Sequence, residues 1–360
     1  MNFLFAAQNS GALHRASNLI GGLMSEGHRI TIKIDPEKFH RLTFKKSLLF
    51  SLNKIGSFEE LHQQIDIVFY GLYGNDLIPE SDLKFLHNTK TKLAIFQNDD
   101  FSQISLERIP LEIQQKAALF LRNHWPSNIK AIPKSIVAKT GFMNSLLGRC
   151  HSASGADLKN RSKDVSFFGT NTGILESNNS REKAIRMLRS AKLELTGGIT
   201  DHPHYPAPVD ISTRRISYKQ HEKVLSDSKI SIALWGHCPL TYRFFESLSR
   251  RCLVIAQDFS SLKFAAGPLE PFLHFIPVKQ DLSDLVEKVT YYLEHRDEAQ
   301  QIANDGFAFF KKYYDYKGLS YPQGLMDEIT SSWKSHYAQA EQNKFQKRCI
   351  RLMACFKKCI

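Results

Sequence analysis

Short apolar runs alternate with longer amphipathic stretches along this chain, and that alternation predicts its fold. Each apolar run is about as long as a strand and is rich in β-branched and aromatic residues. The stretches between the runs place apolar residues at helical spacing. Strands buried on both sides and joined by helices are typical of a parallel sheet covered on both faces. In the first half of the chain, strands are expected at residues 2–7, 28–34, 65–73, 92–100 and 117–124.

The second half repeats this organisation after a less periodic stretch that is richer in Pro, Ser and Gly. Its strands are expected at 164–169, 192–198, 229–235, 252–257 and 274–278, and its helices at 180–191, 217–228, 242–250 and from 282 onward. The expected fold is therefore α/β of the GT-B type, with two Rossmann-like domains whose parallel sheets face a central cleft. The expected boundaries are an N-terminal domain at 1–135, a connection at 136–163, a C-terminal domain at 164–330 and a tail at 331–360.

Charge and composition indicate where in the cell the protein is expected. The chain has 360 residues and a net charge of +12, and the last 17 residues hold six Lys or Arg and no acid. Placed on a helix, this tail is amphipathic and basic, which is typical of a helix that lies on an anionic membrane surface. The alternatives are a solvated terminus or a nucleic-acid contact, for which the interleaved aromatic residues are lacking. No apolar run is long enough to span a bilayer, and the first residues resemble a strand more than a signal peptide.

The six cysteines lack the spacing of a metal site, so they are expected to be free thiols in a reducing compartment. The expected location is therefore the cytoplasm, with the basic tail predicting peripheral attachment at the inner face of the cytoplasmic membrane. No Asp-x-Asp motif occurs, and the prolines of "DHPHYPAP" at 201–208 indicate a loop rather than a metal site. We expect no metal and no cofactor.

Candidate ligand-binding residues follow two strands of the C-terminal domain. In open α/β sheets, ligands bind at the carboxyl ends of strands, where helix N-termini attract anions. The loop "FFGTNTG" at 167–173 and the segment "WGHCPLTYR" at 235–243 both occupy such positions. Arg243 is suited to pair with phosphate oxygens, and Glu246 lies one helical turn further on. The alternative interpretation is that Arg243 and Glu246 form an ordinary surface pair on a helix.

These motifs resemble a known family. "FFGTNTG" followed by Arg181, together with "LEPFLHFIPVKQDLSDL", is similar to the capsule-associated and protein O-glucosyltransferase family, which includes lipopolysaccharide glycosyltransferases. "TYRFFESLSRRCLVI" resembles a segment of exostosin-like transferases. The resemblance implies that Arg243 binds the donor diphosphate and that Glu246 lies toward the ribose. The full set of expected donor-binding residues is Gly169, Thr170, Asn171, Thr172, Arg181, His237, Thr241, Tyr242, Arg243 and Glu246.

The chain also departs from these families. Phe168 stands where the O-glucosyltransferase pattern has arginine, and Arg251 stands where the exostosin pattern has glycine. Cys238 lies eight residues before Glu246, so the paired glutamates of many retaining enzymes are absent. This difference favours an inverting mechanism.

An inverting transferase needs a base, which the first domain would supply. Asp100 is preferred and Asp99 is its neighbour, both at the end of an expected strand, and His14 is the rival candidate. Residues Asn9, Ser10 and Gly11 form the expected acceptor-side loop. For each aspartate the alternative is a helix cap or loop residue, and for His14 a solvated or packed side chain.

The function predicted from these features is transfer of a sugar from a nucleotide-sugar, UDP- or GDP-linked, to a glycan or lipid-linked glycan such as lipopolysaccharide or capsule. The expected partners are the donor, this acceptor and an anionic membrane surface, without nucleic acid. The alternatives are a non-catalytic nucleotide-sugar binding protein, a GT-B-type epimerase or, less favoured, a nucleic-acid binder.

Overall fold

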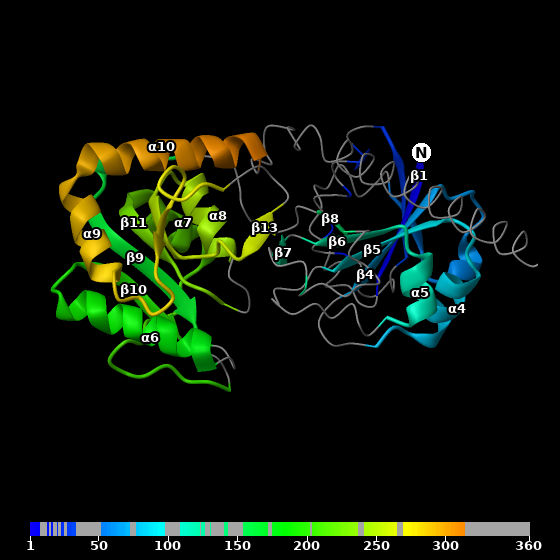
Figure 1. Ribbon diagram of the computed structural model, residues 1–360, viewed down its shortest axis with the longest axis horizontal. Coiled ribbons are helices and arrows are strands. Elements are labelled where there is room, and N and C mark those ends of the chain that lie inside the picture. The colour runs from blue at the N-terminus through cyan, green and yellow to red at the C-terminus, as the bar shows by residue number, and fades with distance from the viewer. Residues whose placement is uncertain are drawn as a thin grey trace, which may run out of the picture. The chain divides into compact units, whose positions relative to one another are not determined.

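The computed structural model describes residues 1–7, 13, 16, 20, 23–24, 27–33, 52–72, 77–97, 109–122, 124–126, 130, 140–142, 154–171, 175–201, 204–236, 241–264 and 269–313. Within these residues the chain forms two compact units, one up to Phe142 and one from Ser154 to Tyr313 (Figure 1). Among the described helices, none is both long and apolar enough to cross a membrane.

The first unit contains a parallel sheet. Its strands are β1 (Asn2–Ala7), β2 (Arg29–Lys33), β3 (Asn53–Ile55), β4 (Ile67–Leu72), β5 (Lys92–Gln97), β6 (Leu119–Arg122) and β8 (Thr140–Phe142), in the spatial order β3-β2-β1-β4-β5-β6-β8. Each neighbouring pair runs parallel. The short 3₁₀ turn η2 (Phe58–Glu60), α4 (Glu80–Asn88), α5 (Leu111–Lys116) and the strand β7 (His124–Pro126) complete the described elements. Every residue of β4 is buried, as expected for a central strand covered on both faces.

A charged side chain, that of Asp82, is buried among the apolar residues of the first unit. Asp82 of α4 is fully buried and receives hydrogen bonds from Lys33 Nζ at 2.6 Å and from the Tyr70 hydroxyl at 2.9 Å. Burial, together with the negative charge of Asp82, raises the pKa of the Tyr70 hydroxyl far above its usual value. Because both oxygens of Asp82 have donors, this carboxylate fixes α4 against β2 and β4.

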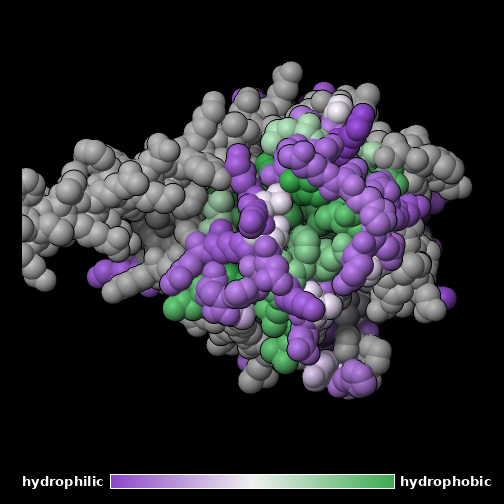
Figure 2. All heavy atoms as spheres, turned by 90° about the vertical axis from the view of Figure 1, so that its right-hand side faces the viewer, coloured by the Kyte–Doolittle hydropathy of each residue, from purple (hydrophilic) through white to green (hydrophobic). Residues whose placement is uncertain are grey.

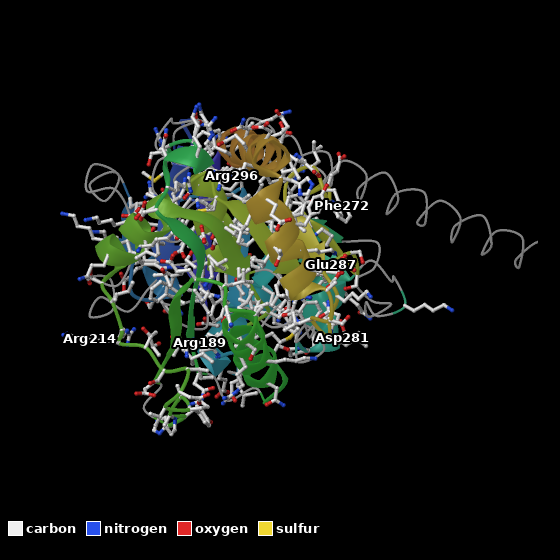
Figure 3. The ribbon with its side chains drawn as sticks, turned by 90° about the vertical axis from the view of Figure 1, so that its left-hand side faces the viewer. Arg189, Arg214, Phe272, Asp281, Glu287 and Arg296 are labelled. Carbon is white, nitrogen blue, oxygen red and sulfur yellow. The ribbon has the colours of Figure 1, made fainter. Side chains whose placement is uncertain are left out.

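The second unit contains a five-stranded parallel sheet in the order β10-β9-β11-β12-β14. Its elements are η6 (Leu158–Asn160), β9 (Lys163–Thr170), α6 (Leu175–Ser190), β10 (Leu195–Thr200), α7 (Tyr218–Asp227), β11 (Ser228–Ala233), α8 (Tyr242–Ser249), β12 (Leu253–Gln257), β13 (Leu262–Phe264), β14 (Ile276–Val278), α9 (Leu285–Glu294) and α10 (Arg296–Tyr313). Charged side chains such as Arg189, Glu287 and Arg296 lie on the outside of this unit (Figure 3).

Two hydrophobic clusters cover the faces of this sheet. In one, α6 and α9 contribute Ala184, Ile185, Leu285 and Val289 to a core with the strands. In the other, α8 and α10 contribute Phe244, Phe245 and Phe310. Helix α7 packs beside α8 and belongs to the same layer. Helices that follow successive strands therefore approach the carboxyl ends of the strands from both sides of the sheet (Figure 1).

Arg161 connects several segments of the second unit. Its buried guanidinium donates to the backbone oxygens of Ala156, Leu225, Ser228, Arg250 and Arg251. These oxygens lie at the C-terminal ends of α7 and α8 and beside η6, where helical carbonyls lack partners within the helix. A single cation thereby satisfies the ends of two helices and attracts their negative dipole ends.

The expected architecture of two parallel α/β sheets is confirmed, with local differences. The long helical run expected from residue 282 is two helices, because the chain leaves the helical conformation at His295 before α10 begins. The strand expected at 192–198 begins only at Leu195, since Lys192 adopts a left-handed conformation (φ 57°) at the end of the preceding turn. Strand β8 adds a strand to the first sheet within the stretch expected to connect the domains.

Candidate functional site

Two arginines meet at the carboxyl edge of the second sheet, one from each face. Arg181 comes from α6 and Arg243 from the first turn of α8. Arg181 Nη1 donates to the backbone oxygen of Thr170 at the end of β9. The Arg243 guanidinium carbon lies 4.9 Å from the centre of the Phe167 ring, on the same strand. Both cations therefore lie over the last residues of β9.

Neither guanidinium has all of its N–H groups hydrogen-bonded within the described part of the chain. Arg181 Nε and the Nε and Nη1 atoms of Arg243 are buried and have no hydrogen-bond partner among the described residues. Burial, with a smaller contribution from the positive charge of Arg243, lowers the pKa of Arg181 to about 9. Burial also lowers the pKa of Arg243 to about 10, opposed by the charge of Glu246. The two groups repel each other in a desolvated position.

A buried donor without an acceptor costs about 1–3 kcal/mol, and more when it is charged. Native proteins rarely leave such groups unpaired unless a ligand, ion or ordered water completes them. Two adjacent cations with three such N–H groups favour a ligand that brings negative charge and several acceptor oxygens. Guanidinium groups bind phosphates well because their N–H groups form a planar fork.

Two glycines leave room for this arrangement. A Cβ on Gly169 would lie 2.9 Å from the Phe167 ring and 3.5 Å from Arg181 Cδ. A Cβ on Gly236, just after β11, would lie 3.1 Å from Arg181 Nη2 and 3.3 Å from Thr241 Cγ2. Any larger residue at position 236 would crowd the guanidinium of Arg181.

Glu246 faces a histidine near Arg243. His221 of α7 lies with Nδ1 3.8 Å from Glu246 Oε2, and the two side chains are only 15% and 14% exposed. Burial, with a smaller contribution from Arg243, lowers the pKa of His221 to about 4. His221 is therefore neutral near pH 7, and its ring packs edge-on against Phe168. The structure describes both Arg243 and Glu246 and shows no ion pair between them.

The alternative interpretation of Arg243 and Glu246 as a surface pair is therefore wrong, because both side chains are largely buried at the strand ends.

The other expected donor-side residues fall around this centre. Thr170 ends β9, and its hydroxyl lies 3.1 Å from that of Thr200. Asn171 is buried and donates to the backbone oxygen of Pro206, while its own side-chain oxygen has no hydrogen-bond partner among the described residues. Thr241 is the N-cap residue of α8, and Tyr242 begins that helix.

Several expected residues lie outside the described residues, and their roles stay predictions. On the donor side these are Thr172 and His237. On the acceptor side they are Asp99, Asp100, His14, Asn9, Ser10 and Gly11.

Sequence reasoning missed His221 and Gly236. His221 follows a capping box formed by Ser217 and Gln220, which predicts a helix start but does not show which face of the helix points to the site. Gly236 could have been found from its place directly after a strand, where a glycine allows close approach of another group.

Comparison with known proteins shows which fold contains these two arginines. Residues 181–318, which contain both arginines, match a family model described as glycosyl transferase-like. The crystal structure of a glycosyltransferase from Rickettsia africae ESF-5 has a TM-score of 0.59 at 10% identity, covering 93% of this chain and 98% of that one. Anabaena HepE, solved in complex with UDP-glucose, has a TM-score of 0.54 at 12% identity, covering 92% and 100%. The fold is GT-B.

Parts of the chain are also similar in sequence to known proteins. The GT-B chain is 38% identical to human protein O-glucosyltransferase 3 over 65 residues, which are 18% of this chain and 13% of that protein. It is 32% identical to the uncharacterized protein 179R of Invertebrate iridescent virus 6 over 119 residues, 31% of this chain and 10% of the viral protein. The chain thus spans less than a fifth of the length of these relatives. The expected resemblance to protein O-glucosyltransferases is confirmed.

Proposed function

We propose that the protein is a glycosyltransferase that takes a sugar from a nucleoside-diphosphate sugar. The observation that carries the proposal is the pair of buried guanidinium groups, Arg181 and Arg243, whose free N–H groups meet at the carboxyl edge of the second sheet. A diphosphate would supply the negative charge and acceptor oxygens that these groups lack. The same contacts would strengthen as charge develops on the leaving diphosphate, which is how such groups accelerate transfer.

The rest of the donor fits around the arginines. Glu246 lies one helical turn beyond Arg243 and offers carboxylate oxygens to the ribose hydroxyls. The free side-chain oxygen of Asn171 is an acceptor for a further N–H or O–H group of the donor. The UDP-glucose held by Anabaena HepE and the similarity to protein O-glucosyltransferases favour a UDP-linked hexose.

The acceptor half of the proposal rests on the sequence. The acceptor would be a glycan or lipid-linked glycan, as in lipopolysaccharide or capsule synthesis. Asp100 would take the proton of the attacking hydroxyl, with Asp99 and His14 as the other candidates for this base, and the loop Asn9–Gly11 would contact the acceptor. Transfer would invert the anomeric centre without a metal, and the basic tail would hold the enzyme at a membrane surface.

Ligand-induced stabilisation tests the donor site directly. UDP, GDP, ADP and their sugar conjugates are added to the wild type, to Arg243→Ala and to Arg214→Ala, a control that removes an exposed arginine elsewhere in the same unit. A ligand at 100 times its Kd adds about 2.7 kcal/mol of stability. We expect one nucleotide class to stabilise the wild type and the control but not Arg243→Ala. Equal stabilisation of all three proteins, or of none, would refute the proposal.

A further inference from the structure

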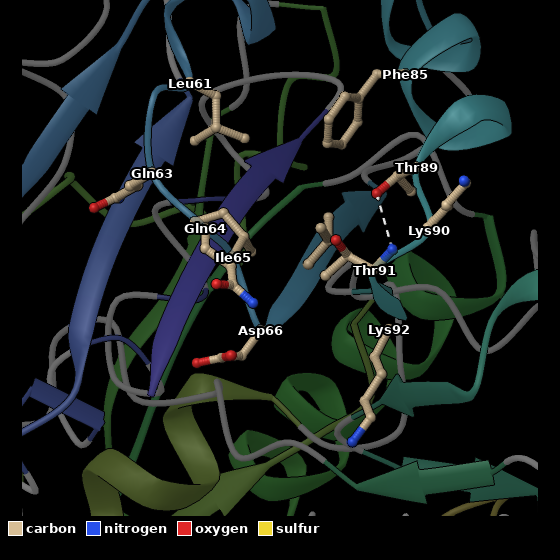
Figure 4. Close-up of a pocket in the computed structure, with 11 residues that line it drawn as sticks. Leu61, Gln63, Gln64, Ile65, Asp66, Phe85, Thr89, Lys90, Thr91 and Lys92 are labelled. Atoms are coloured by element: carbon tan, nitrogen blue, oxygen red, sulfur yellow. Dashed lines mark hydrogen bonds between the residues drawn. The ribbon is translucent and has the colours of Figure 1, made fainter.

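The first unit contains a cavity of about 520 Å³ that the donor site does not use. It is formed by residues 61–68, which lead into β4, and by the segment from the end of α4 into β5 (Figure 4). The cavity therefore lies at the amino ends of these parallel strands, the opposite edge from the carboxyl ends where ligands of open α/β sheets normally bind. Its volume is within the roughly 300–1,000 Å³ that small-molecule sites occupy.

One wall of this cavity is a rigid aromatic ring. Leu61 and Phe85 line one end of the opening (Figure 4). Behind Phe85, the ring of Phe58 stacks in parallel at a centroid distance of 3.8 Å. Lys33 Nζ in turn lies 4.6 Å from the centre of the Phe58 ring. Since Lys33 is held by the buried carboxylate of Asp82, the aromatic wall is fixed before any ligand arrives.

The rim of the cavity is polar, and its side chains keep free hydrogen-bonding atoms. Asp66 accepts from the backbone N–H of Asn2 with one oxygen, at 2.8 Å, and keeps the other. The side-chain amide of Gln64 and the hydroxyl of Thr91 make no hydrogen bond within the described residues. Lys90 and Lys92 add exposed ammonium groups. On the face of the first unit that Figure 2 draws, hydrophilic side chains surround apolar ones.

This combination selects a class of ligand. The rim carries both the carboxylate of Asp66 and the ammonium groups of Lys90 and Lys92, so it does not match a strongly charged ligand of one sign, and a purely apolar ligand would leave the rim groups without partners. A sugar ring matches both parts, because its C–H face packs on an aromatic or aliphatic wall and its hydroxyls both donate and accept hydrogen bonds. We propose that the cavity lined by Leu61, Gln64, Asp66, Phe85 and Thr91 binds a neutral saccharide unit.

The role of this saccharide site in catalysis rests on the proposed glycosyltransferase function, whereas the binding itself does not. A glycan held at a second point stays near the enzyme between encounters, which raises its effective concentration at the reaction centre. The site would therefore lower the KM for long acceptor chains and leave the KM for a short acceptor unchanged.

Saturation-transfer NMR on the full chain tests the proposal with neutral di- and tetrasaccharides of glucose, galactose and N-acetylglucosamine. The test variant is the double substitution Gln64→Ala, Thr91→Ala, because these side chains make no hydrogen bonds within the described protein and their loss should not affect folding. Phe85→Ala is the second variant, with its folding checked by circular dichroism. Lys84→Ala, which changes an exposed residue of the same helix, is the control.

We expect at least one saccharide to bind the wild type and to bind either test variant about ten-fold more weakly or worse, as expected for lost hydrogen bonds or lost packing. Lys84→Ala should match the wild type. Arg243→Ala should also keep saccharide binding even where it loses nucleotide binding, which separates this proposal from the proposed function. The proposal is overturned if no saccharide binds, if only inorganic phosphate binds, or if the double variant binds saccharide as the wild type does.

Discussion

Replacing Arg243 by methionine should move stability and ligand affinity in opposite directions. Methionine keeps an unbranched side chain of similar length but removes the charge and the N–H groups. In the ligand-free protein, Nε and Nη1 of Arg243 are buried without partners and the cation repels Arg181. Removing them recovers about 1–3 kcal/mol for each unsatisfied donor, reduced by the loss of a contact with Phe167 worth about 0.5–2 kcal/mol. For the two donors together, we therefore expect Arg243→Met to raise the free energy of unfolding by up to about 5 kcal/mol.

The same substitution should remove most of the affinity for the nucleotide-sugar. Two charge-assisted hydrogen bonds of about 1.5–3 kcal/mol each would be lost, which corresponds to a Kd at least about 100-fold higher. Urea denaturation without ligand measures the first quantity, and titration calorimetry with UDP-glucose measures the second. Arg243→Lys is the matched control, because it keeps the charge but loses the planar fork and should fall between the two.

A loss of more than about 2 kcal/mol of ligand-free stability in Arg243→Met would refute this reasoning, because it would mean that the guanidinium is satisfied within the protein. An unchanged Kd in the same variant would place the diphosphate elsewhere.

Three further substitutions test neighbouring features. Gly236→Ala places a methyl group about 3.1 Å from Arg181 Nη2, so calorimetry should show about ten-fold weaker nucleotide binding with little change in the urea midpoint, and unchanged binding would contradict the crowding. His221→Gln tests the pKa that burial lowers from 6.5 to about 4: the unfolded chain binds this proton first, so His221 contributes stability above about pH 6.5 that is lost as the pH falls toward 4, up to about 3 kcal/mol. Between pH 4 and 7, the urea midpoint of the variant should change less with pH than that of the wild type. An equal change in both proteins would show that His221 does not cause the pH dependence. Tyr70→Phe removes the hydroxyl that donates to Asp82 and should cost about 1–3 kcal/mol in urea denaturation, whereas a neutral result would show that the remaining donors, Lys33 and Ser81, suffice.

Much of the architecture could be predicted because it depends on local pattern. Strands buried on both faces produce continuous apolar runs, and β4 and β12 lie where such runs occur. Arg243 and Gly169 could be proposed because parallel topology fixes which strand ends meet at one edge. The break between α9 and α10 was missed, since the sequence around His295 contains neither proline nor glycine to mark it.

The state of the site could not be predicted because it depends on tertiary packing. A sequence does not reveal that an arginine in a first helical turn is buried, or that Arg181 arrives from the opposite face of the sheet. The position of His221 against Glu246 likewise arises from the packing of α7 beside α8. Such contacts join residues far apart in the chain, so no local pattern encodes them.

The hydrogen bonds of Arg161 should depend little on ionic strength. Its guanidinium binds backbone oxygens rather than a carboxylate, and no ion pair to it occurs within the described residues. Its electrostatic partners are peptide dipoles inside the protein, which dissolved salt does not screen. Exposed pairs such as Arg186 with Asp210 should weaken as salt is added. The ends of α7 and α8 should instead remain joined in concentrated salt, so the helices that carry His221 and Arg243 keep a common anchor when surface ion pairs weaken.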